Sequence, residues 1–329
     1  ASGHAALVAL AKRKFGIRFQ NIMLVDAGGP PVSMPDAFCY APRDLCLTAI
    51  RQSPEKLGDL GERFRNMDRV IVSCPAADRA DWAFILQALG VRGEVTSDTA
   101  NEFGLIGGVM GLEVEEDFTT LLIATGPLGL RDRLVKRCVD LAIVIPSLML
   151  LAPLFVAVAL AIKLDDGGPV LFRQRRVGRN AVFFAMLKFR TMRTDRCDAD
   201  GAHSTRRSDD RITRIGGFLR RTSLDELPQL FNVLAGSMSL VGPRPHAIGS
   251  RAGEKLFWEV SHDYWLRHAM KPGMTGLAQV RGHRGATTRE EDLTLRLRSD
   301  LEYLSGWTPL RDLAIIARTA RVVMHPNAF

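Results

Sequence analysis

The sequence predicts an α/β protein in two parts: a Rossmann-like domain over residues 1–130, then a mainly helical, membrane-associated part over residues 131–329 with a re-entrant helix and a small β-hairpin. A length of 329 residues suits about two domains. Short β-rich runs separated by a helical pattern predict the first part. An uncharged stretch of 22 residues, followed by two strand-like runs around a turn, predicts the second.

In the first part, the expected strands are Asn21–Asp26, Arg69–Cys74 and Glu94–Thr96, and the expected helix is Asp81–Leu89, ending at Gly90. The turn Asp26-Ala27-Gly28-Gly29-Pro30 has glycines, but it lacks the GxGxxG spacing that lets a backbone approach a pyrophosphate. We therefore predict a degenerate Rossmann-like domain with a regulatory or oligomerising role, which allows a homodimer. Nucleotide binding is the alternative.

The uncharged stretch Leu141–Ile162 would form a helix about 33 Å long, which matches a hydrocarbon core of about 30 Å. Its basic flanks are Arg131, Arg133, Lys136 and Arg137 before it, and Lys163, Arg173, Arg175 and Arg176 after it. The positive-inside rule keeps both flanks on one side, and Pro146 and Pro153 interrupt a helix. We predict a re-entrant helix over about residues 138–163 that breaks at Pro153, with Ser147 helping to satisfy freed backbone groups. The alternative is a buried core helix of a soluble protein.

Two strands, Pro169–Gln174 and Ala181–Phe189, are expected to pair through the turn Gly178-Arg179-Asn180. Helices are expected over Thr213–Arg221, Asp225–Leu234, Gly253–Met270, Thr287–Leu304 and Pro309–Val323. The last is amphipathic, and the third brings aromatic residues beside basic ones. Either pattern is equally typical of a helix on a membrane surface and of ordinary packing on a soluble core.

Charge is unevenly distributed: residues 1–130 hold 12 basic and 16 acidic residues, whereas the remainder holds 32 and 20. A basic part beside an apolar segment favours anionic lipids or phosphorylated ligands. We expect no nucleic acid partner, because the basic part lacks a recognition-helix or zinc-ligand pattern. The five scattered cysteines show no CxxC spacing and are expected to be reduced, in the cytosol.

A dense polar run could carry chemistry. It comprises Arg214, Arg220, Arg221, Thr222, Ser223, Asp225 and Glu226, and then Gly242-Pro243-Arg244-Pro245. Arginines offer planar donors to phosphate oxygens, and adjacent carboxylates can divide the roles of nucleophile, base and metal ligand. The same residues Ser223-Leu224-Asp225-Glu226 also fit a capping box, in which Ser223 and Glu226 only cap a helix. A helix N-terminus also suits an anionic substrate, so the two interpretations are compatible.

The ordered motifs resemble those of the bacterial sugar transferases, the monotopic polyprenyl-phosphate phosphoglycosyl transferases. The motifs are Lys136-Arg137-Cys138-Val139-Asp140, the apolar segment with Pro153, Arg173-Gln174-Arg175-Arg176-Val177-Gly178, Lys188-Phe189-Arg190-Thr191-Met192, Arg220 to Leu230, Gly242-Pro243-Arg244-Pro245 and Lys271-Pro272-Gly273-Met274-Thr275-Gly276. The resemblance covers about residues 131–329, and residues 1–130 resemble the nucleotide-binding-like domain of larger members. Where some relatives have Ser-Pro at the bend, this chain has Ala152-Pro153.

The resemblance implies transfer of a sugar 1-phosphate from a UDP-sugar to a polyprenyl phosphate such as undecaprenyl phosphate, with release of UMP, as the first membrane step of exopolysaccharide, capsule or O-antigen synthesis. It implies that Asp225 is the nucleophile that forms an aspartyl phosphosugar, and that Glu226 is a base and a ligand of Mg²⁺. The phosphate-binding candidates are Arg220, Arg221 and Arg244, with Lys188 and Arg190 as further ones.

The implied location is the cytoplasmic face of the bacterial inner membrane, in contact with its lipids. Larger members have transmembrane helices ahead of the first domain; none is evident in this sequence, as expected of a truncated chain. Two other functions stay open: a Mg²⁺-dependent hydrolase of nucleotide sugars that uses the same carboxylates, and a non-catalytic membrane scaffold. The sequence does not indicate which sugar is transferred.

Overall fold

The computed structural model describes residues 21–29, 32, 37–42, 46–97, 110–114, 119–193, 211–283, 287 and 289–323. The chain divides into two compact units, Ala1–Gly126 and Pro127–Phe329. Both mix helices and strands, so the predicted α/β class is confirmed. Cys197, one of the five cysteines expected to be reduced, lies outside the described residues.

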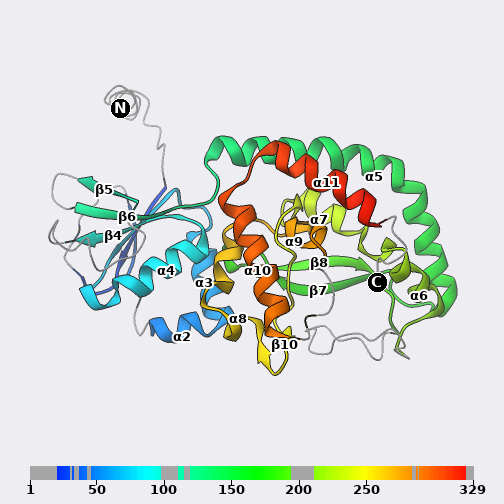
Figure 1. The fold of residues 1–329 in the computed structure, drawn as a ribbon, viewed down its shortest axis with the longest axis horizontal. Coiled ribbons are helices and arrows are strands. Elements are labelled where there is room, and N and C mark those ends of the chain that lie inside the picture. Colours follow the sequence, from blue (N-terminus) through cyan, green and yellow to red (C-terminus); the bar gives the residue numbers. More distant parts are fainter. Residues whose placement is uncertain are drawn as a thin grey trace. The chain divides into compact units, whose positions relative to one another are not determined.

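The first unit contains a six-stranded sheet in the order β2-β1-β3-β4-β6-β5. Figure 1 labels β4, β5 and β6 of this sheet. Its strands are β1 (Ile22–Asp26), β2 (Phe38–Tyr40), β3 (Arg69–Ser73), β4 (Arg92–Ser97), β5 (Gly111–Val114) and β6 (Thr119–Thr125). Its helices are α2 (Leu47–Arg51), α3 (Pro54–Phe64), η1 (Ala76–Asp78) and α4 (Arg79–Leu89). Strands β1 to β4 are parallel, whereas β6 is antiparallel to both of its neighbours. The three predicted strands and the predicted helix are confirmed.

Apolar burial and the ion pair of Arg69 with Glu94 stabilise this sheet. Leu24 of β1 lies opposite Ile71 of β3, and both are buried. Arg69 of β3 donates two hydrogen bonds of 2.6 Å to Glu94 of β4, and Thr120 of β6 donates a third to the same carboxylate at 2.8 Å. Because Glu94 is wholly buried, these donors compensate the loss of its hydration. Helix α4 ends at Gly90, whose left-handed φ of 60° a residue with a side chain rarely adopts.

The second unit begins with the long helix α5 (Leu130–Asp166) and the antiparallel hairpin β7 (Leu171–Val177) and β8 (Phe183–Phe189), joined through η3 (Arg179–Ala181). Next come α6 (Arg214–Arg221), η5 (Leu224–Glu226), α7 (Gln229–Ala235), β9 (Ser239–Val241), β10 (Arg251–Ala252), β11 (Lys255–Leu256), α8 (Phe257–Val260) and η6 (His262–Ala269). The chain continues through β12 (Gly273–Thr275), α9 (Leu277–Val280), α10 (Glu290–Ser305) and α11 (Pro309–Val323). The predicted hairpin and the predicted last helix are confirmed.

The single helix predicted over Gly253–Met270 is wrong. The hairpin β10/β11 turns at Gly253, whose φ is +62°, and extended backbone at Ser261 separates α8 from η6. The helix predicted over Asp225–Leu234 is likewise divided, because Pro228 stands between η5 and α7.

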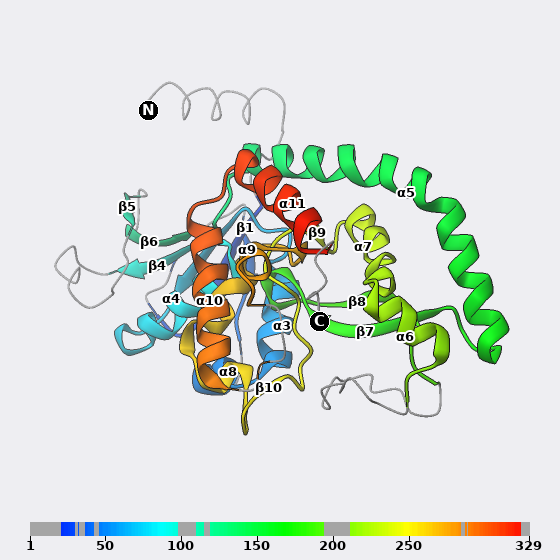
Figure 2. The same ribbon diagram turned by 45° about the vertical axis from the view of Figure 1, so that its right-hand side comes forward.

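Helix α5 stays helical through Pro146 and Pro153, so the structure has a bend in place of the predicted break (Figures 1 and 2). The hydroxyl of Ser147 donates to the Ile143 carbonyl at 2.7 Å, a contact with the preceding turn that is associated with bent helices. A proline at position 146 also weakens the hydrogen bonding of that turn.

The core-helix alternative for α5 is wrong. Only 11% of its most apolar 18-residue window is buried, and Leu150, for example, is 81% exposed. One side of the helix packs on the unit through Val144 and Val158. Among the described helices, α5 is the one whose length and apolar composition would suffice to cross a membrane.

Candidate active site

The two adjacent carboxylates lie on η5, one turn after the end of α6. Ser223, immediately before η5, has a φ of +56°, which is unusual for a residue with a side chain and marks local backbone strain. Its hydroxyl caps nothing, and the Glu226 carboxylate points to two cations and not back to the Ser223 amide. The capping-box interpretation is therefore wrong, because the left-handed turn at Ser223 removes the geometry that a cap requires.

Glu226 is held between a strand and a loop. Nζ of Lys188, on β8, donates to Oε1 at 2.9 Å, and Nη2 of Arg244, in the loop after β9, donates to the same oxygen at 2.6 Å. Burial alone would raise the pKa of Glu226, but the charges of Arg244 and Lys188 outweigh it and hold that pKa well below its usual value. Glu226 is thus an anion at neutral pH.

Asp225 has a different environment, although it is the next residue. Its Oδ2 lies 3.9 Å from Nζ of Lys188, and its side chain is 13% exposed. Burial raises the pKa of Asp225, Lys188 partly offsets this, and the neighbouring Glu226 raises it further. Two carboxylates with pKa values moved in opposite directions are typical of a pair that divides two roles.

The predicted phosphate-binding residues fall into three groups. Lys188, Arg220 and Arg244 all lie near the pair: the first and third contact Glu226, and the charge of Arg220 lowers the pKa of Asp225. Arg221 is exposed at the end of α6. Arg190 is engaged elsewhere, because its guanidinium donates to the Asp166 carboxylate and to backbone carbonyls. Arg190 therefore has a structural role in this fold.

A polar hollow lies beside the pair, lined by Arg176, Met186, Lys188, Gln229, Arg244 and Pro245. Three of these residues are cations, so the hollow suits an anionic group. Arg176 was not among the predicted site residues. The period of two along the hairpin could have found it, because Arg176 and Lys188 lie on the same face of the paired strands.

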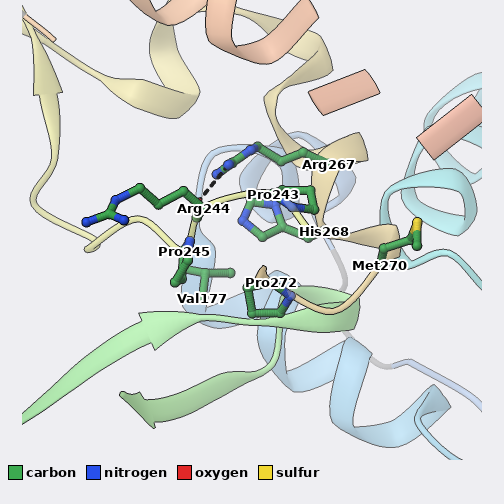
Figure 3. Close-up of a pocket in the computed structure, with 8 residues that line it drawn as sticks. All are labelled: Val177, Pro243, Arg244, Pro245, Arg267, His268, Met270 and Pro272. Atoms are coloured by element: carbon green, nitrogen blue, oxygen red, sulfur yellow. Dashed lines mark hydrogen bonds between the residues drawn. The ribbon is translucent and has the colours of Figure 1, made fainter. Parts of the chain in front are cut away.

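Arg267, on η6, holds the loop that carries Arg244 in place. Nη2 of Arg267 donates to the Arg244 carbonyl at 2.7 Å, and Arg267 is itself paired with Asp300 of α10 at the same distance. Figure 3 shows the Arg244 side chain extending away from Arg267 and from the small cavity beneath the loop. The buried His246 contacts Arg267 at 2.8 Å, and burial and the nearby arginines hold its pKa well below the usual value. These contacts orient the Arg244 side chain toward Glu226.

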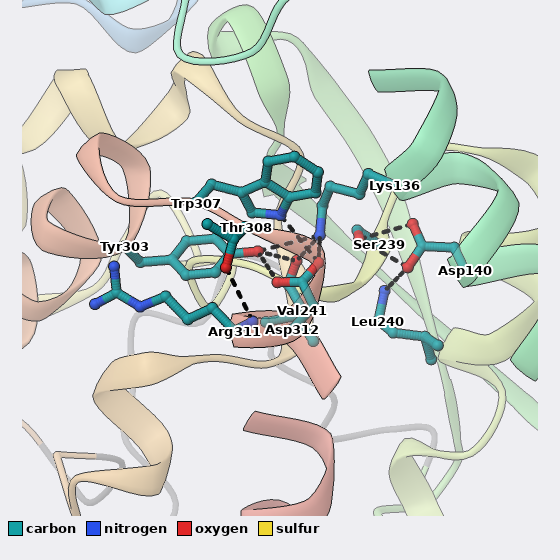
Figure 4. Close-up of polar contacts among 10 residues, drawn as sticks. All are labelled: Lys136, Asp140, Ser239, Leu240, Val241, Tyr303, Trp307, Thr308, Arg311 and Asp312. Atoms are coloured by element: carbon teal, nitrogen blue, oxygen red, sulfur yellow. Dashed lines mark hydrogen bonds and ion pairs between the residues drawn. The ribbon is translucent and has the colours of Figure 1, made fainter. Parts of the chain in front are cut away.

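The first turns of α5 are bonded to the same loop region (Figure 4). Lys136 donates to the Asp312 carboxylate of α11 at 2.6 Å and to the Val241 carbonyl of β9 at 2.9 Å. Asp140 accepts from the Ser239 hydroxyl and from the Leu240 amide. Strand β9 leads directly into the loop that carries Arg244. The same strand therefore contacts helix α5 and positions the candidate site.

No cluster of three or more His, Cys, Asp or Glu side chains occurs in the described part of the chain. Among the described residues, Asp225 and Glu226 are the adjacent carboxylates at the site that could bind the predicted Mg²⁺. Mg²⁺ in phosphoryl-transfer sites is commonly held by one or two carboxylates together with substrate phosphates. The donor set fits the ion in this mode.

The family model of the bacterial sugar transferases matches residues 131–326. The chain belongs to this family. A bacterial sugar transferase named undecaprenyl-phosphate glucose phosphotransferase, from Komagataeibacter xylinus, is 50% identical over 213 residues, 64% of this chain and 40% of that protein. The exopolysaccharide production protein PSS of Rhizobium leguminosarum bv. phaseoli is 53% identical over 188 residues, 57% of this chain and 94% of that protein.

A UDP-glucose:undecaprenyl-phosphate glucose-1-phosphate transferase from Xanthomonas campestris pv. campestris is 38% identical over 303 residues, 88% of this chain and 60% of that protein. The alignments with the Komagataeibacter and Xanthomonas proteins thus span 40% and 60% of those proteins. The apolar helix α5 and the family together indicate association with a membrane.

Proposed function

We propose that this sugar transferase moves a sugar 1-phosphate from a UDP-sugar to undecaprenyl phosphate or a similar polyprenyl phosphate at the cytoplasmic face of the inner membrane. The observation that carries the proposal is the pair Asp225 and Glu226, set among Lys188, Arg220 and Arg244. The name of the Xanthomonas relative favours UDP-glucose as the donor, and the name of the Komagataeibacter relative also specifies glucose. The name of the Rhizobium relative favours a place in exopolysaccharide production.

In the proposed first step, an oxygen of Asp225 attacks the sugar-bearing phosphorus, and the bond from that phosphorus to the oxygen of UMP breaks. In the second step, a phosphate oxygen of the lipid attacks the same phosphorus, and Asp225 leaves as a carboxylate. Dividing the transfer in this way brings each anion to the site separately. Lys188, Arg220 and Arg244 offset the charge of the phosphates.

The Glu226 carboxylate, held ionised by Arg244 and Lys188, would bind Mg²⁺ with the substrate phosphates, whereas its low pKa makes it a poor acceptor for a proton from the lipid phosphate. When bound, Mg²⁺ supplies charge neutralisation at the phosphate oxygens. This use of Glu226 is compatible with its low pKa, because the ion requires the carboxylate form.

The contacts of α5 support the re-entrant topology. Its first turns bond to β9 and α11 through Lys136. Its last turn bonds through Asp166 to Arg190, the residue after β8, and through Asp165 to α6. Since both ends are bonded to the same unit, we expect both to lie on the same side of a membrane. The exposed apolar residues between them, such as Leu150, would then enter one leaflet at the bend.

For the first unit we propose a degenerate Rossmann-like domain that regulates or dimerises the protein. Its parallel strands have the order β2-β1-β3-β4, as in doubly wound sheets. At Gly29, in the turn after β1, an added Cβ would lie 2.3 Å from the Cys74 amide nitrogen. This glycine therefore serves a close contact with the end of β3, which argues against an open phosphate-binding turn.

Covalent labelling tests the function. Full-length protein in detergent is incubated with Mg²⁺ and UDP-glucose labelled in the sugar phosphate, without acceptor. We expect the protein to retain label, to release UMP, and to pass the label to undecaprenyl phosphate when the lipid is added. Asp225→Asn should retain none, whereas Asp263→Asn, an exposed aspartate on η6, should behave as the unmodified protein.

The other functions predict different results. Continuous UMP release with free sugar phosphate and no lipid would establish a hydrolase. Absence of label and of UMP release across a panel of UDP-sugars would leave the non-catalytic membrane scaffold as the remaining function. Substantial transfer by folded Asp225→Asn would contradict the assigned nucleophile.

A further inference from the structure

Two adjacent carboxylates end helix α5, and the proposed chemistry does not use them. Asp166 forms a bidentate ion pair with Arg190, and the Arg190 side chain is 3% exposed. Asp165 accepts a hydrogen bond of 3.3 Å from the Ile215 amide in the first turn of α6. Acidic residues at a helix C-terminus oppose the helix dipole, so their position does not stabilise α5 itself. Their contacts with other elements explain the position better.

Each contacted element also carries a residue of the site. Arg190 follows β8, two residues after Lys188, and Ile215 begins the helix that carries Arg220. The elements are further joined at Thr191, where Nε of Arg220 donates to the threonine hydroxyl at 2.8 Å. Helix α6 approaches this point so closely that a Cβ at Gly216 would lie 2.1 Å from the Thr191 carbonyl oxygen. A movement of the end of α5 would therefore move Lys188 and Arg220.

We propose that Asp165 and Asp166 are positioning residues for the carboxylate pair: they fix β8 and α6 to the end of α5 and so hold Lys188 and Arg220 around Asp225. This inference rests on the proposed function. The distance at stake is the 3.9 Å between Lys188 Nζ and Asp225 Oδ2, which a small shift would lengthen. Misplacement by about 1 Å can slow an enzyme by about 100-fold.

Kinetics with matched variants test the positioning role. We expect Asp166→Asn to lower kcat per folded molecule by about 10- to 100-fold. Arg190→Gln should lower it at least as much, because Arg190 also donates to the Pro169 and Met192 carbonyls. The double variant should lose no more than Arg190→Gln alone, since both changes break the same ion pair. Asp166→Glu should restore part of the rate. The control is Asp132→Asn, which removes the same charge from an exposed position in the first turn of α5 and should leave the rate unchanged.

Rescue by the conservative variant separates positioning from a merely structural role. Asp166→Glu keeps the charge that pairs with Arg190 and so should keep Lys188 and Arg220 near Asp225, whereas Asp166→Asn loses the ion pair. Equal rates for Asp166→Asn and the unmodified protein would overturn the proposal, and so would a failure of Asp166→Glu to recover any of the rate that Asp166→Asn loses.

Hydrogen exchange gives a readout that needs no turnover. In the double variant Asp165→Asn with Asp166→Asn, we expect faster exchange at Ile215 and along β8 and α6, with α10 unchanged. An equal rise in α10 would show a global loss of stability and would overturn the positioning role. If the unmodified protein transfers no sugar phosphate, the proposed function fails, while the exchange pattern still decides whether α5 holds the two elements.

Discussion

Nη2 of Arg244 donates to Oε1 of Glu226 at 2.6 Å, joining the loop after β9 to η5 across 18 positions of sequence. Lys188 reaches the same oxygen from β8. The carboxylate that would hold Mg²⁺ is thereby oriented by two cations before substrate arrives, and Arg244 also faces the hollow beside the pair.

Arg244→Gln should lower kcat/KM for the UDP-sugar by about 10- to 100-fold. A hydrogen bond to a charged group contributes about 1.5–3 kcal/mol, and the variant loses it at Glu226 and at the substrate phosphate. Steady-state kinetics in detergent measure the effect. Arg251→Gln, an exposed arginine of β10, is the matched control and should change nothing. Equal kinetics for the two variants would remove Arg244 from the site.

Lys136→Met should destabilise the second unit by about 3–5 kcal/mol, because it leaves the buried carboxylate of Asp312 without its cation. Adding Asp312→Asn should recover part of the loss. Denaturant unfolding measures both. The control is Lys255→Met, which breaks an exposed pair with Glu290 and should cost about 0–1 kcal/mol. Equal losses at the two lysines would contradict the importance of burial.

Stability should fall in acid through Asp166. The hydrogen bonds from Arg190 lower the pKa of Asp166 from 3.8 to about 2. A group whose pKa is lowered by folding stabilises the folded protein at pH values above its ordinary pKa. For Asp166 this contribution is lost as pH falls from 3.8 through about 2. Urea unfolding of the detergent-solubilised protein over this range should show a shallower pH dependence in Asp166→Asn. An unchanged dependence would mean that the ion pair is absent in solution.

The topology of α5 can be measured with single cysteines in a background without native ones. Arg131→Cys and Pro169→Cys flank the helix at exposed positions, and both should be labelled from the cytoplasmic side only. Leu150→Cys should be shielded from both sides. The double variant Pro146→Ala with Pro153→Ala should straighten the helix, because each replacement gains up to about 3 kcal/mol in helix propensity. The same variant should have lower activity. Labelling of the two flanks from opposite sides would establish a single crossing.

A chain that begins at Gly129 should still transfer the sugar phosphate in detergent. Every residue of the proposed site lies in the unit Pro127–Phe329, which has its own buried clusters. The Rhizobium relative aligns over 94% of its length with 57% of this chain. Too little of that relative remains to correspond to the unaligned part of this chain. Turnover per folded molecule is the measurement. Loss of activity in a folded truncation would show that the first unit completes the site or an obligatory dimer.

Elements whose signals are local could be predicted from the sequence. Two strand-like runs around the turn Gly178-Arg179-Asn180 located β7 and β8, Gly90 ended α4, and α11 has the predicted bounds Pro309–Val323. The ordered motifs also determined the family, because fixed residue types in a fixed order are visible without any fold. In the same way, the length and composition of Leu141–Ile162 indicated a membrane segment.

Tertiary structure decided how polar residues are used. Ser223 and Glu226 have the spacing of a capping box. No cap forms, because Ser223 is in a left-handed conformation and Glu226 accepts hydrogen bonds from Lys188 and Arg244. Arg190 matches the charge of a phosphate ligand and yet binds Asp166, 24 positions away. A charged side chain pairs with whichever opposite charge the fold brings near, and local sequence holds no information about that distance. The period of two indicates that Arg176 and Lys188 share a face of the hairpin, but that both line one hollow depends on how β7 pairs with β8.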